Sequence, residues 1–239
     1  MHGIGPAVAL ITVGSTLMGG MLGLRLRHRL SGAMAFTGGV VLGVALLDVL
    51  PEAVSRLRTG RIVGESVIGG FLFFFFLSRA LVLEHRDDPR SAAGHRPVGV
   101  LGAAALSFHS FLDGFGIGAA FTVSTSVGVA VLIAVVSHDF ADGMNTVTFV
   151  LSQTNDAKRA RRWLFVDAVA PFAGALVGAS FQPSAHVFGI GLGVFAGIFI
   201  MIGAGELLPE AHSEPSAARL ALTAAGVALM FAVTRLASL

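Results

Sequence analysis

Apolar residues fill most of the chain in eight long segments, and short polar or charged stretches separate one segment from the next. The segments lie at approximately 6–24, 33–57, 63–84, 98–121, 126–152, 164–182, 187–209 and 217–237. A helix needs about 20 apolar residues to cross the hydrocarbon core of a bilayer. The pattern therefore predicts eight transmembrane helices, which form a single domain over residues 1–239.

The amino-acid composition also indicates a membrane protein. Of its 239 residues, 54% are hydrophobic and 13% are charged, and the mean hydropathy is +0.82. A soluble domain carries about 25% charged residues. We therefore expect an all-α integral membrane protein surrounded by the lipid bilayer. The chain has no cysteine, which excludes disulfides, thiolate metal ligands and cysteine nucleophiles.

Basic residues lie at the ends of the apolar segments and indicate the orientation, because cytoplasmic loops are enriched in Lys and Arg. With the N-terminus outside, the inner loops hold twelve basic residues and the outer side holds four. Both termini are therefore expected outside, and the polar stretch 85–97 is expected to be a cytoplasmic loop. No nucleic-acid-binding motif is present, so nucleic acid is not an expected partner. Abundant Ala and Arg with a single Lys indicate a GC-rich bacterium and hence its inner membrane.

Two related hexapeptides lie inside the fourth and fifth segments, HSFLDG at 109–114 and HDFADG at 138–143. Each places a His and an Asp four residues apart, and residues with this spacing project from one face of a helix. A charge at the bilayer centre costs about 2.5–3.5 kcal/mol, so these acids need a partner or a water-filled path. Neither hexapeptide has a Lys or Arg nearby, which leaves a bound cation or protons as the partner.

A divalent metal ion held between two helices is the simplest chemistry for the four paired side chains. These are His109, Asp113, His138 and Asp142. Four such ligands can close a tetrahedral shell, and imidazole with carboxylate suits Zn²⁺, Cd²⁺, Fe²⁺, Mn²⁺ or Co²⁺. Ser110 and Asp139 each follow a His, about 100° further round the helix, and could hold a second ion with the other oxygens of Asp113 and Asp142. A hydrogen-bonded polar seam without metal is the alternative interpretation.

A second pair of matching motifs ends the second and seventh segments, and it reads DVLPEA at 48–53 and ELLPEA at 206–211. Consecutive spans run in opposite directions, so the two pairs of motifs indicate an inverted repeat that meets at the bilayer midplane. The acidic side chains would line a cation path on either side of the metal site, with a histidine at the inner exit. These residues are Asp48, Glu52, Glu206, Glu210 and His212. Acids near helix ends can also simply meet water.

Together these features resemble the ZIP (Zrt/Irt-like) family of metal transporters. The resemblance rests on the eight segments, the outside N-terminus, the loop between the third and fourth segments, and the pattern H-[NS]-x-x-[DE]-G in the fourth. The hexapeptide at 138–143 is similar to the bacterial form of the family's next motif, [QH]-D-x-x-[DE]-G. The LPEA endings also fit the family, so the resemblance covers essentially the whole chain.

The resemblance implies a 3+2+3 arrangement of the eight helices, a binuclear site between the fourth and fifth, and movement of metal toward the cytosol. By the family pattern, the first ion is held by His109, Asp113, His138 and Asp142, and the second by Ser110, Asp113, Asp139 and Asp142. We expect transport of one or two divalent ions, zinc first among them, by alternating access. We expect no enzymatic activity, and the resemblance is compatible with a homodimer.

The chain departs from the family pattern in its sixth segment. Relatives often carry Glu-Pro there as a further ligand, whereas this chain has Ala170-Pro171, and Ser110 replaces a common Asn. Asp167 is expected to be a loop-end or cap residue and not a ligand. Two alternative functions remain open. An intramembrane metal-dependent hydrolase would need an open coordination position and a general base, and a metal-sensing membrane protein would bind metal without moving it.

Overall fold

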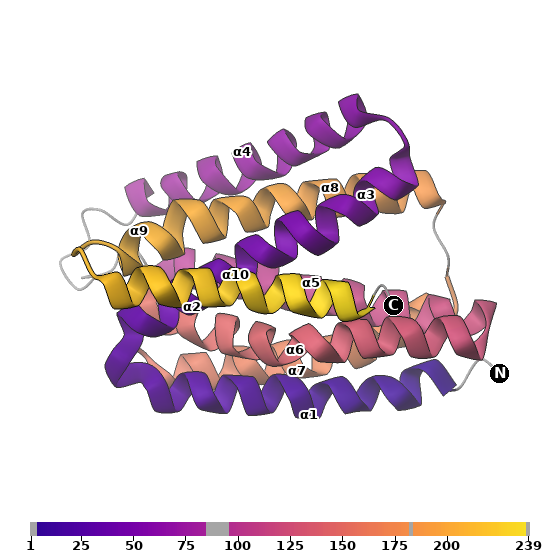
Figure 1. The fold of residues 1–239 in the computed structure, drawn as a ribbon, viewed down its shortest axis with the longest axis horizontal. Helices are drawn as coiled ribbons and strands as arrows, with labels where there is room; N and C mark the ends of the chain where they lie inside the picture. The colour runs from indigo at the N-terminus through magenta and orange to yellow at the C-terminus, as the bar shows by residue number, and fades with distance from the viewer. Residues whose placement is uncertain (1–3, 85–95, 182–183, 238–239) are drawn as a thin grey trace.

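The computed structural model describes residues 4–84, 96–181 and 184–237. Within these residues all regular secondary structure is helical and no strand is present. The long helices run side by side in one elongated bundle (Figure 1), so the expected all-α class is confirmed. Most of the expected loop at 85–97 lies outside the described residues, and Arg96 already begins a helix.

The helices follow one another with short connections, some of them 3₁₀ or π segments. In chain order they are α1 (Ile4–Arg25), the 3₁₀ turn η1 (Leu26–Arg29), α2 (Leu30–Val44), the π segment η2 (Ala45–Val49), α3 (Leu50–Leu57), α4 (Gly60–Glu84), α5 (Arg96–Val123), α6 (Thr125–Thr154), α7 (Ala157–Gly178), α8 (Ala185–Ile200), the π segment η3 (Met201–Leu207), α9 (Leu208–Ala211) and α10 (Ala217–Ala237). Most ends differ from the apolar segments by a few residues. The largest difference is at α7, because its first two turns are basic and the apolar pattern does not include them.

Asp156 defines the start of α7. Its carboxylate accepts hydrogen bonds from the backbone N–H groups of Lys158, at 2.9 Å, and Arg159, at 3.1 Å. These bonds make Asp156 an N-cap, and the bond from Arg159 above all holds the pKa of the Asp156 carboxyl below its usual range. Asn155, which precedes it, adopts a left-handed φ of 50°. Asn tolerates that conformation, so the chain can reverse here and bring α7 back against α6.

Five stretches of the described residues are long and apolar enough to cross a membrane by length and composition. They are Ile4–Leu57, Gly60–Ala80, Gly99–Val123, Ala185–Ala211 and Ala217–Arg235. The first is not one straight span, because the chain turns back at η1 between α1 and α2 (Figure 1). These stretches support an integral membrane protein, whereas the count of eight crossings stays a prediction.

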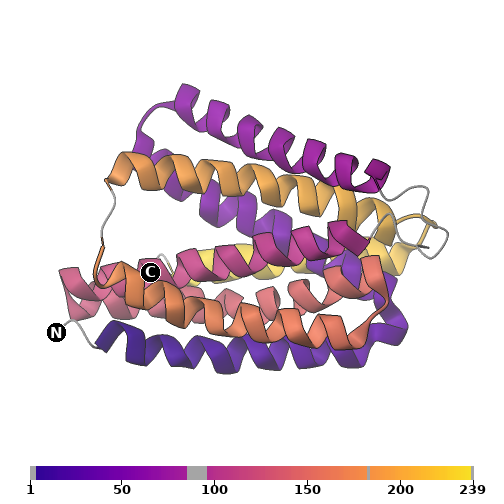
Figure 2. The same ribbon diagram turned by 180° about the vertical axis from the view of Figure 1, so that it is seen from behind.

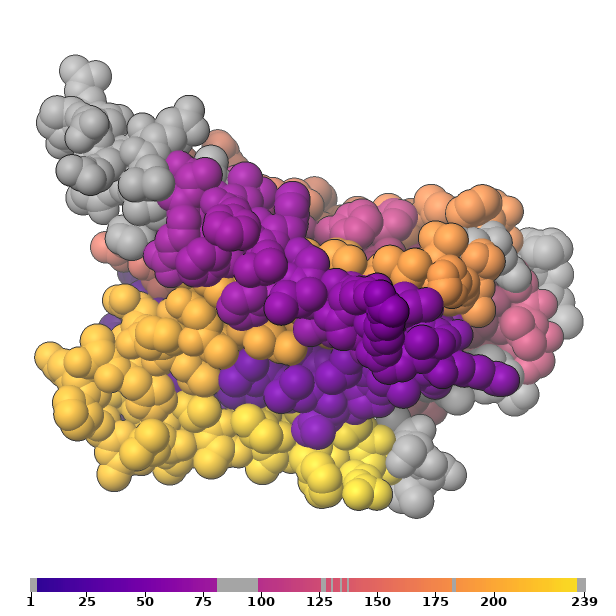
Figure 3. Space-filling model, turned by 90° about the horizontal axis from the view of Figure 1, so that it is seen from above, coloured from indigo at the N-terminus to yellow at the C-terminus, as the bar shows by residue number. Residues whose placement is uncertain are grey.

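The helices pack in two main sets. α1, α5, α6 and α7 contact one another, while α2 packs against α10 and α8 packs against α3 and α4. The reverse view shows the same grouping (Figure 2). Seen from above, α4 lies across α8, and α10 forms one edge of that face (Figure 3). The first set therefore holds both hexapeptide helices, α5 and α6.

Glycines let the backbones of neighbouring helices in the first set come into direct contact. A Cβ atom added at Gly114 of α5 would overlap the backbone carbonyl of Pro171 in α7, and one added at Gly143 of α6 would overlap that of Thr16 in α1. Such close approach of small residues is the usual means of packing helices in lipid. Since Gly114 and Gly143 end the two hexapeptides, the same residues position the candidate ligands.

Two π segments interrupt the chain just before its two LPEA sequences. Asp48 lies in η2 and Glu206 lies in η3, and the prolines of the following helices α3 and α9 stand in their first turns. A π segment widens the helix and frequently occurs at functional sites. Proline is tolerated in a first turn because its missing N–H would have no intrahelical partner there. A π segment thus directly precedes the sequence LPEA both at the start of α3 and at the start of α9.

We predict that Gly114→Ala destabilises the protein, because the new Cβ would meet the Pro171 carbonyl. Overpacking of this kind costs about 1–3 kcal/mol. The midpoint of thermal unfolding in detergent should therefore fall. Gly116→Ala is the matched control on the same helix, since a Cβ added at Gly116 meets no atom within 4 Å. Equal melting temperatures for the two variants would contradict this account of the α5–α7 contact.

Candidate metal site

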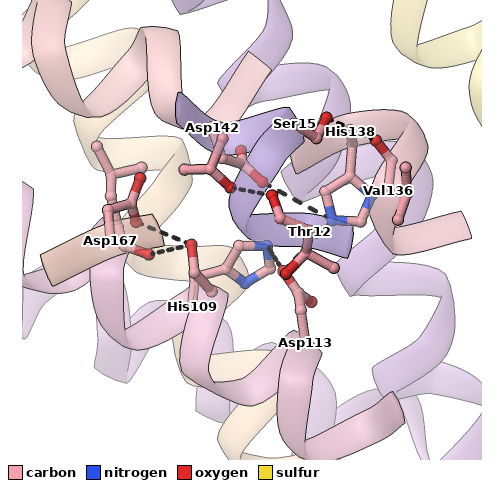
Figure 4. A network of polar contacts seen from close by, with 11 residues as sticks. Thr12, Ser15, His109, Asp113, Val136, His138, Asp142 and Asp167 are labelled. Atoms are coloured by element: carbon pink, nitrogen blue, oxygen red, sulfur yellow. Dashed lines mark hydrogen bonds and ion pairs between the residues drawn. The ribbon is translucent and has the colours of Figure 1, made fainter. Parts of the chain in front are cut away.

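Four side chains from two helices converge at the centre of the first helix set. His109 and Asp113 lie one turn apart on α5, and His138 and Asp142 lie one turn apart on α6. One ligand atom from each residue lies within 4.8 Å of the others. Figure 4 shows the four side chains pointing toward one another across the α5–α6 contact. The i, i+4 spacing of each hexapeptide therefore has the geometric effect expected from the sequence.

Asp113 is at the centre of this group. Its Oδ2 atom lies 3.2 Å from Nε2 of His109 and 3.3 Å from Nε2 of His138. His138 Nε2 also lies 3.8 Å from Oδ2 of Asp142. All four residues are largely buried, and Asp113 is the most accessible of them. Two imidazoles and two carboxylates at these distances form a set of nitrogen and oxygen donors that suits a tetrahedral divalent ion.

Ser110 and Asp139 lie outside this tight group. Asp139 is fully buried, and neither of its carboxylate oxygens has a hydrogen-bond partner among the described residues. The Ser110 hydroxyl does not point to the four ligands but to α7, where it donates to Oδ1 of Asp167 at 2.9 Å. Buried polar groups are nearly always paired. The unpaired Asp139 carboxylate therefore marks a position that needs a cation, a proton or a small movement of the helices.

Asp167 corrects one expectation from the sequence. It is not a loop-end or cap residue, because it lies inside α7 with no exposed surface and contacts the hexapeptide helix through Ser110. Figure 4 shows it on the opposite side of His109 from Asp113. Its second oxygen has no hydrogen-bond partner among the described residues. Asp167 lies within an apolar segment of the sequence, and this could have indicated that it is buried. The nearby basic residues instead favoured a position at the surface.

A cavity of about 710 Å³ reaches three of the four residues, and its lining extends to Val123 at the end of α5 and Thr234 near the end of α10. His109, Asp113 and His138 lie at its inner end, and Asp48 and Glu52 line its wall. The structure thus brings the acids of the first LPEA motif and the ligands onto one continuous surface. A hydrated cation could travel along this surface before it loses its water.

Aromatic side chains fill the opposite side of the site. The His109 ring lies edge-on to Phe199, with ring centroids 4.7 Å apart, and its centroid is 6.3 Å from that of Phe195. Phe149 and Leu106 are fully buried in the same apolar cluster. Apolar side chains therefore cover the side of His109 that faces Phe195 and Phe199.

The remaining path residues lie at that other end and do not approach the four ligands. Glu206 is 11% exposed and forms an ion pair with Arg79 of α4, with 3.5 Å between Oε1 and Nη2. Glu210 is exposed. His212 does not join it in a cluster but contacts the Thr223 hydroxyl of α10 at 3.0 Å. The structure therefore does not bring these three residues together in one cluster.

Comparison with known proteins gives a consistent result. A model of the family described as "ZIP Zinc transporter" matches residues 82–234, which contain both hexapeptides. The zinc transporter ZupT of Corynebacterium aurimucosum is 28% identical over 222 residues, which cover 83% of this chain and 83% of the relative. ZupT of Chlorobium limicola is 26% identical over 231 residues, which cover 86% of this chain and 87% of the relative. The zinc transporter YKE4 of Saccharomyces cerevisiae is 28% identical over 180 residues, which cover 66% of this chain and 51% of the relative.

We predict that Asp167→Ala weakens zinc binding, because the Ser110 hydroxyl beside His109 would lose its acceptor. Loss of a residue that supports a metal ligand typically lowers affinity about 10- to 100-fold. Isothermal titration calorimetry of the purified protein would measure the change. Asp156→Asn is the control, since it alters an exposed acid on the same helix and Asn remains a good N-cap. Equal zinc affinities for the two variants would leave Asp167 with a purely structural role.

Proposed function

The chain belongs to the ZIP zinc transporter family, and on this premise we propose that it moves divalent transition-metal ions, zinc first among them, across a membrane through the His/Asp cluster of α5 and α6. One observation carries the proposal. Four nitrogen and oxygen donors converge within 4.8 Å, and three of the residues that carry them, His109, Asp113 and His138, line a cavity. A site of this kind can take an ion from one side and hold it without the surrounding water.

The ion itself is the cargo in this proposal. His109, Asp113, His138 and Asp142 hold the first ion. A second ion would use Asp139 and Ser110 with the remaining oxygens of Asp113 and Asp142. Support for the second position is the buried Asp139 carboxylate without a partner. Cd²⁺, Fe²⁺, Mn²⁺ and Co²⁺ fit the same donor types, and we propose them as further substrates.

Transport fits the site better than catalysis or sensing. A hydrolase needs a general base beside a metal-bound water, whereas Asp113, the acid that contacts both histidines, is itself one of the proposed ligands. The three relatives described above are all named zinc transporters, and none of them is named as a hydrolase or a sensor. The continuous surface from Asp48 to His138 is a route for an ion, which a sensor does not require.

The proposed topology is a single domain over residues 1–239 with eight crossings, a 3+2+3 arrangement, inverted repeats and both termini outside. The matched π segments before the two LPEA sequences support the repeat. The chain ends of α1 and α10 lie at the same end of the bundle, which supports an even number of crossings (Figures 1 and 2). The chain is an integral membrane protein, and we propose the bacterial inner membrane as its location and a homodimer as its assembly.

In this orientation the cavity faces outward. Asp48 and Glu52 would collect the ion, the four ligands would hold it, and Glu206, Glu210 and His212 would receive it on the cytosolic side. Release on the cytosolic side would then require movement of the aromatic side chains that pack against His109. Alternating access describes this change, since the outward cavity must close before the inner side opens.

We predict that Asp113→Ala and His138→Ala abolish metal uptake, because each removes a ligand and Asp113 contacts both histidines. The purified protein would be reconstituted into liposomes that contain a metal-sensitive dye, with Zn²⁺, Cd²⁺, Mn²⁺, Fe²⁺ or Co²⁺ added outside. Wild-type protein should give a saturable signal, and the order of rates would rank the metals.

The control for this experiment is Glu65→Gln, which removes an exposed acid of α4 that does not line the cavity. It should transport at the wild-type rate. Wild-type uptake by both ligand variants would disprove the site assignment. Tight zinc binding by the wild-type protein without any uptake would instead favour a sensor or an enzyme.

A further inference from the structure

A positively charged side chain stands in the wall of a cavity that is otherwise suited to cations. Arg56 is the one Lys or Arg among the described residues that line it. Asp48 and Glu52 line the same cavity one turn apart, so outside the ligand group its wall carries two carboxyl groups and one guanidinium. A fixed positive charge on a cation route works against capture, and its presence therefore calls for an explanation.

Two contacts hold the Arg56 guanidinium in place. Its Nε donates to Oε1 of Glu52 at 2.7 Å, within α3. Its Cζ lies 4.7 Å from the centroid of the Phe188 ring of α8, a distance typical of cation–π contacts. The Phe188 ring in turn lies 5.7 Å from that of Phe115 in α5. Arg56 thus stands in a short row of side chains that connects α3, α8 and α5 at the cavity.

The Arg56–Glu52 pair can open at low cost. The two side chains are 36% and 46% exposed, and an exposed ion pair between residues i and i+4 of a helix contributes only about 0.3–0.5 kcal/mol. When the guanidinium leaves Glu52, the Phe188 ring face remains as its second partner. The carboxylate of Glu52 is therefore masked by a cation that an arriving ion can displace.

We propose that the Arg56 guanidinium competes with incoming cations for the Glu52 carboxylate. This competition sets both the capture rate and the charge selectivity of the outer cavity. This proposal rests on the transport function above. A monovalent ion that displaces the guanidinium exchanges one unit of positive charge for another and gains nothing. A divalent ion brings twice the charge to Asp48 and Glu52 and gains from the exchange. Arg56 thereby keeps abundant monovalent cations off the entrance while it admits the cargo.

The test compares initial rates of zinc uptake in liposomes for wild-type protein, Arg56→Gln and Arg56→Lys. Removal of the charge in Arg56→Gln should raise kcat/KM about three- to tenfold at low ionic strength, through a lower KM with kcat unchanged. Addition of about 0.15 M KCl should reduce kcat/KM of Arg56→Gln more than that of wild type, because the Debye length falls to about 8 Å and K⁺ now competes for an unmasked site. Arg56→Lys keeps the charge and should stay close to wild type.

Arg61→Gln provides a matched control. Arg61 and Glu65 form the same kind of i, i+4 pair on α4, with 2.7 Å between Nε and Oε1, but they are 86% and 60% exposed and do not line the cavity. This variant changes the net charge of the protein as Arg56→Gln does. Its kcat/KM should therefore equal that of wild type. Thermal unfolding of each variant would establish that the protein is folded before the rates are compared.

Three outcomes would overturn the proposal. kcat/KM of Arg56→Gln could equal that of wild type, it could fall below wild type, or it could rise equally in Arg61→Gln. The second result would mean that Arg56 holds Glu52 in a productive position, and the third that only surface charge matters. Failure of the transport function itself is distinguishable, because wild-type protein would then give no uptake or Asp113→Ala would retain it.

Discussion

The electrostatic cost of carboxylates between apolar helices is the constraint on which the structure depends. Asp113 and Asp142 lie at the α5–α6 contact, and Asp113 shares one oxygen between two imidazoles. In many membrane proteins an arginine or lysine would balance such acids. Here the neighbours of Asp113 are histidines, which bind a metal as neutral ligands. The position that balances the charge is therefore left for an exchangeable cation, and this is the property that a transporter needs.

Close backbone packing keeps the ligands in place. Gly114 and Gly143 end the two hexapeptides and bring α5 against α7 and α6 against α1. Because the backbones touch, the ligand side chains are fixed by the helices and not by flexible loops. Asp167 contributes to the same end, since it reaches the hexapeptide helix from α7 and fixes the direction of the Ser110 hydroxyl. The candidate first ion site and the candidate second position thus share one frame of four packed helices, α1, α5, α6 and α7.

The two sides of the site differ in a way that suits alternating access. On one side a cavity lined by Asp48 and Glu52 reaches the ligands, and on the other Phe195 and Phe199 pack against His109. Arginine meets an acid of the path at both ends, as Arg56 with Glu52 and Arg79 with Glu206. Glu52 and Glu206 therefore each have an arginine beside them, and an ion that binds either carboxylate would exchange with that arginine.

The sequence by itself determined the helical class and the four side chains that converge between α5 and α6. Hydrophobicity over about 20 residues and a spacing of four residues are local properties, so the pairs His109–Asp113 and His138–Asp142 could be predicted without knowledge of the fold. The start of α7 could not be read from the apolar pattern, because its first turns are basic. The role of Asp167 depended on the rotation and depth of α7 against α5, a contact between residues 57 positions apart. The direction of the cavity and the contact of Arg56 with Phe188 were likewise decided by packing between distant helices, since apolar periodicity shows that a helix face is buried but not which neighbour covers it.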